Sequence, residues 1–157
     1  MRRTLFVLSL FAGACGADDP APIVTVLSVT PDTLSPDDDL LDDVRILVRY
    51  EDPDGDLGEG TAQVHDCRGD ELRTDLLIPA IAPDGLVADG AKITGSLDLH
   101  VTDVGAFSPT TLPAVCEELG VAAPAANETV FCVVLVDAKG HEGPGDCTTT
   151  VELVVAP

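Results

Sequence analysis

Apolar and polar residues alternate with a period of two along three segments of the chain, 44–50, 91–101 and 148–155. Such alternation is typical of a β-strand that turns one face to a core and the other to solvent. The pattern therefore predicts three half-buried strands. The residues expected to face the core are Val44, Ile46, Val48 and Tyr50 in the first, Ile93, Leu97, Leu99 and Val101 in the second, and Thr149, Val151, Leu153 and Val155 in the third.

An unbroken apolar run at 130–136 predicts a central strand that is covered on both faces. Segments 23–30, 61–67 and 72–78 carry weaker strand signals. These strands, lettered A to G in chain order, predict an all-β fold, a seven-stranded antiparallel β-sandwich of two sheets. The turn sequences expected between them are Pro31-Asp32, Asp54-Gly55, Asp84-Gly85, Asp89-Gly90 and Gly143-Pro144-Gly145.

Residues 102–129, between the fifth and sixth expected strands, break the alternation and are called the E–F insertion below. A loop of this length is uncommon in a compact domain and is usually either functional or disordered. Its best helical segment is 114–119, which Gly120 would end as a C-cap. We expect Cys116 to tie the insertion to the rest of the fold.

The composition fits one acidic domain. The chain has 157 residues, of which 45% are hydrophobic, enough to bury a core. Eight Lys and Arg residues stand against 28 Asp and Glu residues, which gives a formal net charge of -20. So acidic a surface repels phosphates, and with 3% aromatic residues it offers no stacking platform for bases. The composition therefore predicts no nucleic-acid partner.

The first 14 residues have the features of a secretory signal peptide. Arg2 and Arg3 precede an apolar stretch at 5–11, and small residues follow. The apolar stretch is too short to span a bilayer, and no later segment is long enough. Residues 12–14 (AGA) fit an ordinary signal-peptidase site. Together with Cys15 they also resemble a bacterial lipobox, in which the cysteine is acylated, although Ala12 stands where the usual pattern has Leu.

We favour the lipobox because the apolar stretch ends where a lipobox requires and an acidic, Pro-containing segment follows at once. The expected organisation is a signal peptide at 1–14, a lipid-anchored tether at 15–22 and one domain at 23–157. This resemblance implies a cell-envelope protein attached to a membrane through lipid on Cys15. Gly16, in place of an Asp after the cysteine, favours the outer membrane or cell surface.

The chain has five cysteines, an odd number that lipidation of Cys15 would explain. The remaining four, outside the cytoplasm, predict two disulfides. Three connectivities are open, and we favour one that joins Cys116 to Cys132 and Cys67 to Cys147. The chain contains no C-x-x-C motif, which argues against a zinc site and against a redox-active dithiol.

Two segments resemble bacterial Ig-like and cadherin-like sandwich domains. Residues 50–57 (YEDPDGDL) follow the second expected strand and look like the B–C region of these domains. Residues 133–140 (VVLVDAKG), with a Gly-rich turn and a final alternating strand, look like their F–G hairpin. The resemblance spans roughly 23–155 and implies an Ig-like β-sandwich with an adhesive, scaffolding or spacer role. The E–F insertion and the four cysteines depart from the simple pattern.

The acidic stretch 51–59 is the sharpest candidate for a ligand site. Asp52, Asp54 and Asp56 alternate in a Gly-containing loop, and convergent carboxylates are what a hard cation such as Ca²⁺ requires. The spacing is not that of an EF-hand loop. In an Ig-like sandwich the B–C and F–G loops share one end, so Asp137 would lie nearby. The alternative is a solvated acidic turn whose Asp side chains bond their own backbone.

Sequence motifs for catalysis are absent. His65, His100 and His141 form no ligand pair, and there is neither a G-x-S-x-G elbow nor a phosphate-binding Gly loop. The chain is therefore expected not to be an enzyme and to need no cofactor, apart from the calcium alternative. The expected function is that of a lipid-anchored Ig-like envelope module that binds an envelope protein or polysaccharide or has a structural role. The rival hypothesis is a calcium-dependent adhesion or scaffold module of the same fold.

Overall fold

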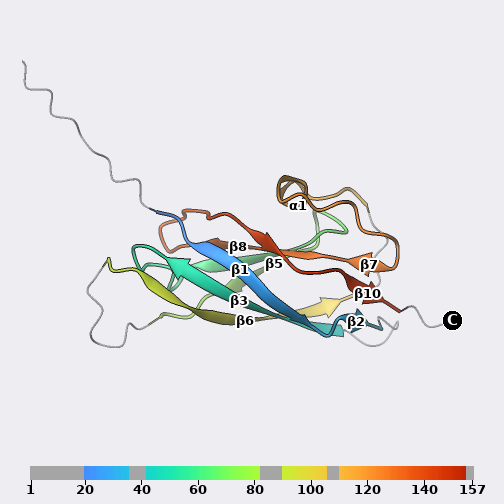
Figure 1. The fold of residues 1–157 in the computed structure, drawn as a ribbon, viewed down its shortest axis with the longest axis horizontal. Helices are drawn as coiled ribbons and strands as arrows, with labels where there is room; N and C mark the ends of the chain where they lie inside the picture. Colours follow the sequence, from blue (N-terminus) through green and yellow to red (C-terminus); the bar gives the residue numbers. More distant parts are fainter. Residues whose placement is uncertain (1–19, 36–41, 82–89, 106–109, 155–157) are drawn as a thin grey trace, which may run out of the picture.

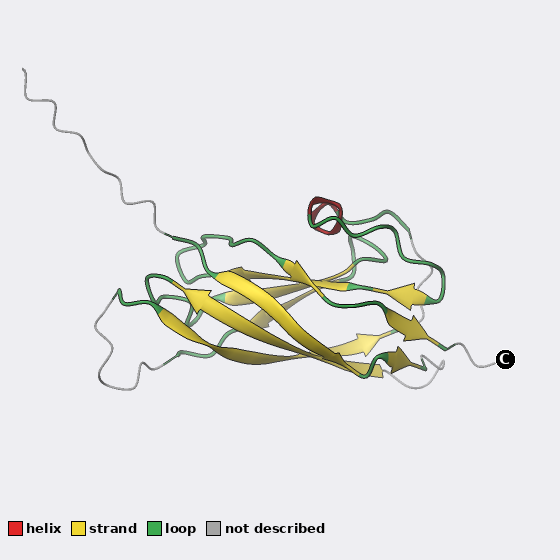
Figure 2. Ribbon diagram, viewed as in Figure 1, coloured by secondary structure: helices red, strands yellow, loops and turns green. Residues whose placement is uncertain are grey.

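The computed structural model describes residues 20–35, 42–81, 90–105 and 110–154. The expected signal peptide, Cys15, most of the tether and the turn at Asp84-Gly85 lie outside these ranges. The described chain is all-β with one short helix and long loops (Figures 1 and 2), and no helix in it has the length and apolar character that crossing a membrane requires. Its elements are β1 Ile23–Thr30, β2 Thr33–Leu34, β3 Asp42–Asp52, β4 Thr61–Asp66, β5 Arg73–Leu77, β6 Ile93–Val104, α1 Ala114–Glu118, β7 Glu128–Thr129, β8 Phe131–Val136, β9 Asp146–Cys147 and β10 Val151–Leu153.

The strands form two antiparallel sheets and one small mixed sheet. The first sheet has the order β1-β3-β6, and the second has the order β5-β4-β8-β9. In the third, β10 pairs parallel with β2 and antiparallel with β7. The first two sheets lie one above the other in Figure 1, so their facing side chains define the interior. The all-β, antiparallel prediction is confirmed at this level.

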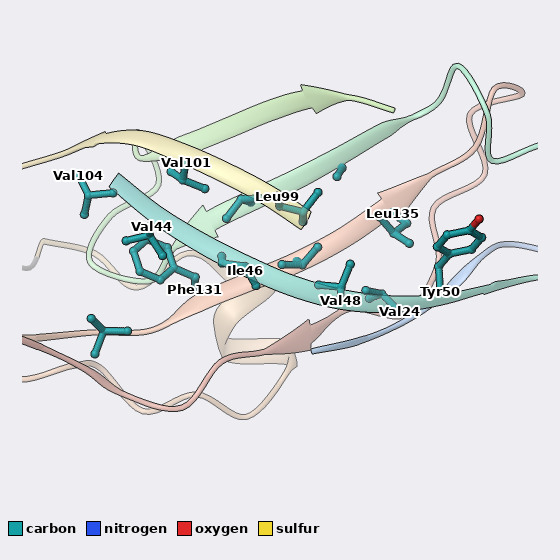
Figure 3. Packing of buried hydrophobic residues seen from close by; sticks show 14 of the residues in the cluster. Val24, Val44, Ile46, Val48, Tyr50, Leu99, Val101, Val104, Phe131 and Leu135 are labelled. Atoms are coloured by element: carbon teal, nitrogen blue, oxygen red, sulfur yellow. The ribbon is translucent and has the colours of Figure 1, made fainter. Parts of the chain in front are cut away.

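One hydrophobic core fills the space between the two larger sheets (Figure 3). The side chains predicted to alternate inward from β3 are buried, and those between them are exposed. Each such side chain contributes about 1.5–3 kcal/mol when it leaves water completely. The buried residues from the first sheet are Val24, Val44, Ile46, Val48, Tyr50, Leu99, Val101 and Val104, and those opposite them include Ala62, Val64, Phe131, Val133 and Leu135.

The prediction of a central strand covered on both faces is confirmed by β8. It lies between β4 and β9, and its first five residues are all buried. Phe131, Val133 and Leu135 belong to the main core. Cys132 belongs to a second apolar cluster on the outer face, where α1 of the E–F insertion packs. Figure 1 shows α1 on the side of β8 away from β3 and β6. The insertion therefore makes the outer face of this sheet a second interior.

The predicted helix at 114–119 is confirmed, with α1 at Ala114–Glu118 and Leu119 as its C-cap. Gly120 follows with φ +78°, the left-handed conformation that glycine adopts most easily. The N–H groups of Gly120 and Val121 donate to the carbonyl oxygens of Glu117 and Cys116. This pair of bonds is the Schellman motif, which satisfies the last carbonyls of the helix.

The final strand, expected at 148–155, is shorter than predicted: in the described residues it is β10, Val151–Leu153, which pairs with β2 and β7. A separate two-residue strand, β9, precedes it at Asp146–Cys147 and pairs with β8. Between them Thr148 is buried, with its Oγ1 accepting the N–H of Phe131 at 3.1 Å, while Thr149 is exposed. Val151 and Leu153 are buried as expected. The side chain of Thr148 fills the inward position here, so the alternation shifts by one residue.

The four cysteines do form two disulfides, but the favoured pairing is wrong. The bonds join Cys67 to Cys116 and Cys132 to Cys147. Cys132 and Cys147 lie directly opposite each other on β8 and β9, with Cα atoms 4.1 Å apart. Cys67 follows β4 and reaches α1, so this bond ties the E–F insertion to the second sheet, as expected of Cys116. Strand register pairs Cys132 with Cys147, and the packing of α1 on the second sheet pairs Cys67 with Cys116; the spacing of the cysteines along the chain reveals neither.

Candidate functional site

Three of the four aspartates proposed as ligands meet at one end of the molecule. Asp52 is the last residue of β3, and Asp54 and Asp56 follow in the B–C loop, residues 53–60. One carboxylate oxygen from each lies within 4.8 Å of the others. Gly55, at φ +79°, makes the tight turn, and a Cβ there would lie 2.5 Å from the carbonyl oxygen of Ala91. The turn thus gathers the three carboxylates, which we call the acidic cluster.

Asp52 lies at the buried base of the acidic cluster, with 0% of its surface exposed. Its Oδ2 accepts the backbone N–H of Leu57 at 2.7 Å. Its Oδ1 is buried and has no hydrogen-bond partner, and the same holds for Oδ1 of Asp54 and Oδ1 of Asp56. A buried polar atom without a partner costs about 1–3 kcal/mol, and more when it carries charge. These oxygens have lone pairs that a cation could use.

The electrostatics of the acidic cluster are unfavourable for three bare carboxylates. Burial raises the pKa of Asp52, and the neighbouring carboxyl of Asp54 raises it further, although the N–H of Leu57 opposes both effects. Burial, and then the charge of Asp52, also raises the pKa of the Tyr50 hydroxyl. A cation placed among the carboxylates would relieve this accumulation of negative charge.

The acidic cluster meets one such positive charge in Lys139, which sequence reasoning did not single out. Its Nζ lies 3.1 Å from Oδ2 of Asp54 and 2.9 Å from Oδ2 of Asp56. Lys139 and Asp54 are 85 residues apart in the chain. The signal that could have found Lys139 is its position within 133–140, since the loop after this strand was expected to lie beside the B–C loop. A backbone hydrogen bond also joins the two loops directly: the N–H of Ala138 donates to the carbonyl oxygen of Asp56 at 3.2 Å.

Asp137, the fourth proposed ligand, has a different role in the geometry. Its Oδ1 accepts the backbone N–H groups of Lys139 and His141, each at 2.8 Å, and its Oδ2 lies 2.8 Å from Nδ1 of His141. Burial acts to raise the pKa of Asp137, but the hydrogen bonds from His141 and Lys139 outweigh it and hold the pKa below its ordinary value. Asp137 therefore fixes the turn 137–142, which we call the F–G turn. Among the described residues it is not part of the acidic cluster.

A buried ion pair lies at the end of β4 that is farther from the acidic cluster. Arg68 is fully buried, and its Nε lies 3.0 Å from both carboxylate oxygens of Asp66. Thr129 donates its hydroxyl to Asp66 Oδ1 at 2.6 Å, and Nη1 of Arg68 donates to the carbonyl oxygen of Gly105 at 2.9 Å. Sequence reasoning missed this ion pair. It joins the ends of β4, β6 and β7 where the E–F insertion leaves and rejoins the sheets.

The three sulfur atoms of Cys67, Cys116 and Cys132 also lie within 4.8 Å of one another. They are not free ligands, since all three belong to disulfides. The two disulfides are in contact, with Sγ of Cys67 3.4 Å from Sγ of Cys132. These sulfur atoms therefore belong to disulfides that lie within the second apolar cluster, and they do not form a metal site.

A cleft of about 330 Å³ opens between the edges of β5 and β6. Its polar lining includes Asp66, Glu71, Arg73 and Asp103. Asp66 is already committed to Arg68, and the lining contains no histidine, cysteine or serine that could act as a nucleophile or general base. The acidic cluster therefore remains the site with the clearest chemistry.

Comparison with known proteins gave no match to any family model, curated protein or solved structure.

Proposed function

We propose that this chain is a lipid-anchored Ig-like module of the bacterial cell envelope, with a binding or structural role. The observation that carries the proposal is the pairing of four cysteines with each other in two disulfides. Disulfides of this kind persist in oxidising compartments outside the cytoplasm, which agrees with an N-terminal export signal. Since the pairing uses Cys67, Cys116, Cys132 and Cys147, it leaves Cys15 for acylation.

The strand order supports the Ig-like part of the proposal. Strands β1, β3 and β6 form one sheet, and strands β5, β4, β8 and β9 form the other. Immunoglobulin constant domains divide their strands in a related way, except that the strand at the position of β5 joins the opposite sheet. The proposed fold is a variant of this sandwich in which β5 pairs with β4. The candidate contact surfaces for an envelope protein or polysaccharide are the E–F insertion and the end that carries the acidic cluster.

The intact mass of the protein extracted from its native membrane tests this proposal. The sample is alkylated with and without prior reduction. We expect a diacyl or triacyl modification on Cys15 and no alkylated thiol until the disulfides are reduced. An unmodified Cys15 in the mature protein would overturn the lipid anchor, and a disulfide-linked dimer through Cys15 would replace it.

A second candidate function is a calcium-dependent module of the same fold, and the buried Oδ1 of Asp52 favours it. Ca²⁺ takes six to eight oxygen ligands and accepts irregular geometry. The acidic cluster offers three carboxylates with buried oxygens that lack hydrogen bonds. Bound calcium would hold the B–C loop rigid beside the F–G turn. Calcium sites of extracellular modules have dissociation constants of about 10⁻⁴–10⁻³ M.

A calcium titration of the melting temperature tests this candidate. With a dissociation constant near 1 mM, 10 mM Ca²⁺ would stabilise the native state by about 1.4 kcal/mol. The variant Asp54→Asn should lose this stabilisation. The variant Asp98→Asn should keep it, because Asp98 lies on the exposed face of β6 and pairs with Arg45. A shift in the wild-type protein no larger than that given by Mg²⁺ would rule out calcium dependence.

A further inference from the structure

Lys139 contacts two of the three carboxylates that a metal ion in the acidic cluster would use. Its ammonium group contacts carboxylate oxygens of Asp54 and Asp56 at 3.1 and 2.9 Å. These two acid side chains are 16% and 20% exposed, while the side chain of Lys139 is 51% exposed. The lysine side chain is thus half-exposed while it contacts the two carboxylates.

The F–G turn that carries Lys139 does not depend on this contact. Asp137 holds the backbone N–H groups of Lys139 and His141, and the N–H of Gly140 donates to the carbonyl oxygen of Asp137 at 3.1 Å. Withdrawal of the lysine therefore requires rotation of a flexible four-carbon side chain and leaves the backbone of the turn in place. An exposed lysine side chain regains rotamer freedom when it is released.

A single ammonium group satisfies the acidic cluster incompletely. Lys139 brings one positive charge, and with it in place Oδ1 of Asp52 still has no hydrogen-bond partner. A divalent cation brings two charges and coordinates several oxygens at once. Both cations would lie against the carboxylates of Asp54 and Asp56, so their positive charges repel and the binding of one disfavours the other.

We propose that Lys139 is a tethered competitor that occupies the calcium site of the metal-free protein and sets its affinity for Ca²⁺. The proposal rests on the calcium-dependent function above. Lys139 stabilises the loops when calcium is scarce, and every binding event must first displace it. Its role is to keep the affinity of a three-carboxylate site low, so that the site responds to changes in external calcium.

The variant Lys139→Gln tests the proposal in the full mature chain with both disulfides formed. Isothermal calorimetry with CaCl₂ after EDTA treatment gives the dissociation constant. Partly exposed lysine–carboxylate pairs are weak, so removal of two of them should tighten calcium binding about three- to thirtyfold. Lys139→Arg keeps the charge and should bind calcium within about twofold of the wild-type value.

Arg45→Gln is the matched control. It removes the same charge from β3, and Arg45 precedes Asp52 by seven residues, a distance of about 23 Å along the strand. Its charge is screened from the acidic cluster at 0.15 M salt, where the Debye length is about 8 Å. Its calcium affinity should equal that of the wild-type protein.

Melting temperatures provide a second readout. Without calcium, Lys139→Gln should melt below the wild-type protein, because the acidic cluster has lost its counter-charge. In saturating calcium the two should melt at the same temperature. This convergence distinguishes competition from a merely structural salt bridge, whose loss would lower the melting temperature equally in both conditions.

The outcomes separate the two proposals. Tighter binding by Lys139→Gln alone supports the tethered competitor. Equal affinities in wild type and Lys139→Gln would overturn it and leave the calcium function standing. Binding by Lys139→Gln with none in the wild type would support the competition and overturn calcium dependence in the native protein. An absence of binding in both would overturn both proposals.

Discussion

The buried ion pair between Asp66 and Arg68 allows a quantitative prediction. In the variant Asp66→Asn the side chain keeps its size but loses its charge, while the guanidinium of Arg68 stays enclosed. The side chain of Arg68 is 0% exposed and that of Asp66 is 8% exposed, so water does not replace the lost carboxylate. Arg68 also donates through Nη1 to the carbonyl oxygen of Gly105 at 2.9 Å, but a neutral carbonyl does not replace the charge of the carboxylate. The expected result is a buried guanidinium that has lost the carboxylate of Asp66.

The burial of the ion pair sets how much unfolding free energy the variant Asp66→Asn should lose. Removal of one partner of a buried ion pair costs about 3–5 kcal/mol. Arg73 and Asp75 form a pair of similar length on β5, with both side chains 47% exposed. An exposed pair of this kind contributes at most about 1 kcal/mol. Asp66→Asn should therefore destabilise the protein several times more than Asp75→Asn.

Equilibrium unfolding in urea, with the disulfides intact, measures the difference in stability between Asp66→Asn and Asp75→Asn. With a slope near 1.5 kcal/mol/M, a loss of 3–5 kcal/mol moves the midpoint by about 2 to 3 M. The double variant Asp66→Asn/Arg68→Met removes the uncompensated charge as well and should be more stable than Asp66→Asn alone. If Asp66→Asn shifted the midpoint no more than Asp75→Asn, burial would not control the strength of this pair and the reasoning would be refuted.

Three further predictions concern the disulfides, a histidine and a glycine. Peptide mapping without reduction should find 67 joined to 116 and 132 joined to 147, and a fragment joining 116 to 132 would contradict the structure. Removal of the first bond, which closes 49 residues, should cost about 4 kcal/mol, and removal of the second, which closes 15, about 3 kcal/mol, both measured by urea unfolding. Burial, and then the charge of Arg73, lowers the pKa of His65 below 6.5, which NMR titration of its ring protons measures. Because the unfolded chain takes up this proton first, stability should fall as the pH drops through 6.5 towards the folded pKa, and His65→Gln should flatten that decline. Gly55→Ala should cost more stability than Gly90→Ala, since both residues have positive φ but only at Gly55 does a Cβ meet a backbone oxygen, at 2.5 Å; equal thermal shifts would show that the contact relaxes freely.

Local pattern was enough to place most of the strands. The alternation at 44–50 and 91–101 appears as the buried faces of β3 and β6, and the apolar run at 130–136 became the central strand β8. These features depend on which face of a strand leaves water. An alternation of apolar and polar residues with a period of two identifies that face directly. The short helix and its terminal Gly120 were predictable for a similar reason, because the C-cap is a local backbone requirement.

The acidic cluster was predictable only in part. Asp52, Asp54 and Asp56 meet because they belong to one turn, so their spacing along the chain carries the information. Lys139 reaches the same place from a loop on another strand, and its contact depends on how β3 and β8 end relative to each other. The role of Asp137 also depends on tertiary geometry, since its carboxylate turned towards its own backbone and away from the cluster.

By itself the sequence determined the all-β character, the inward faces of the main strands, the number of disulfides and the location of the acidic turn. Only the tertiary structure decided the disulfide partners, the pairing of β9 and β10 with different sheets, the burial of Arg68 against Asp66, and the approach of Lys139 to the acidic turn. The physical reason is the range of the forces involved. Periodicity and turn chemistry act between near neighbours in the chain, whereas strand register and the pairing of charges join residues that are dozens of positions apart and become neighbours only when the sheets assemble.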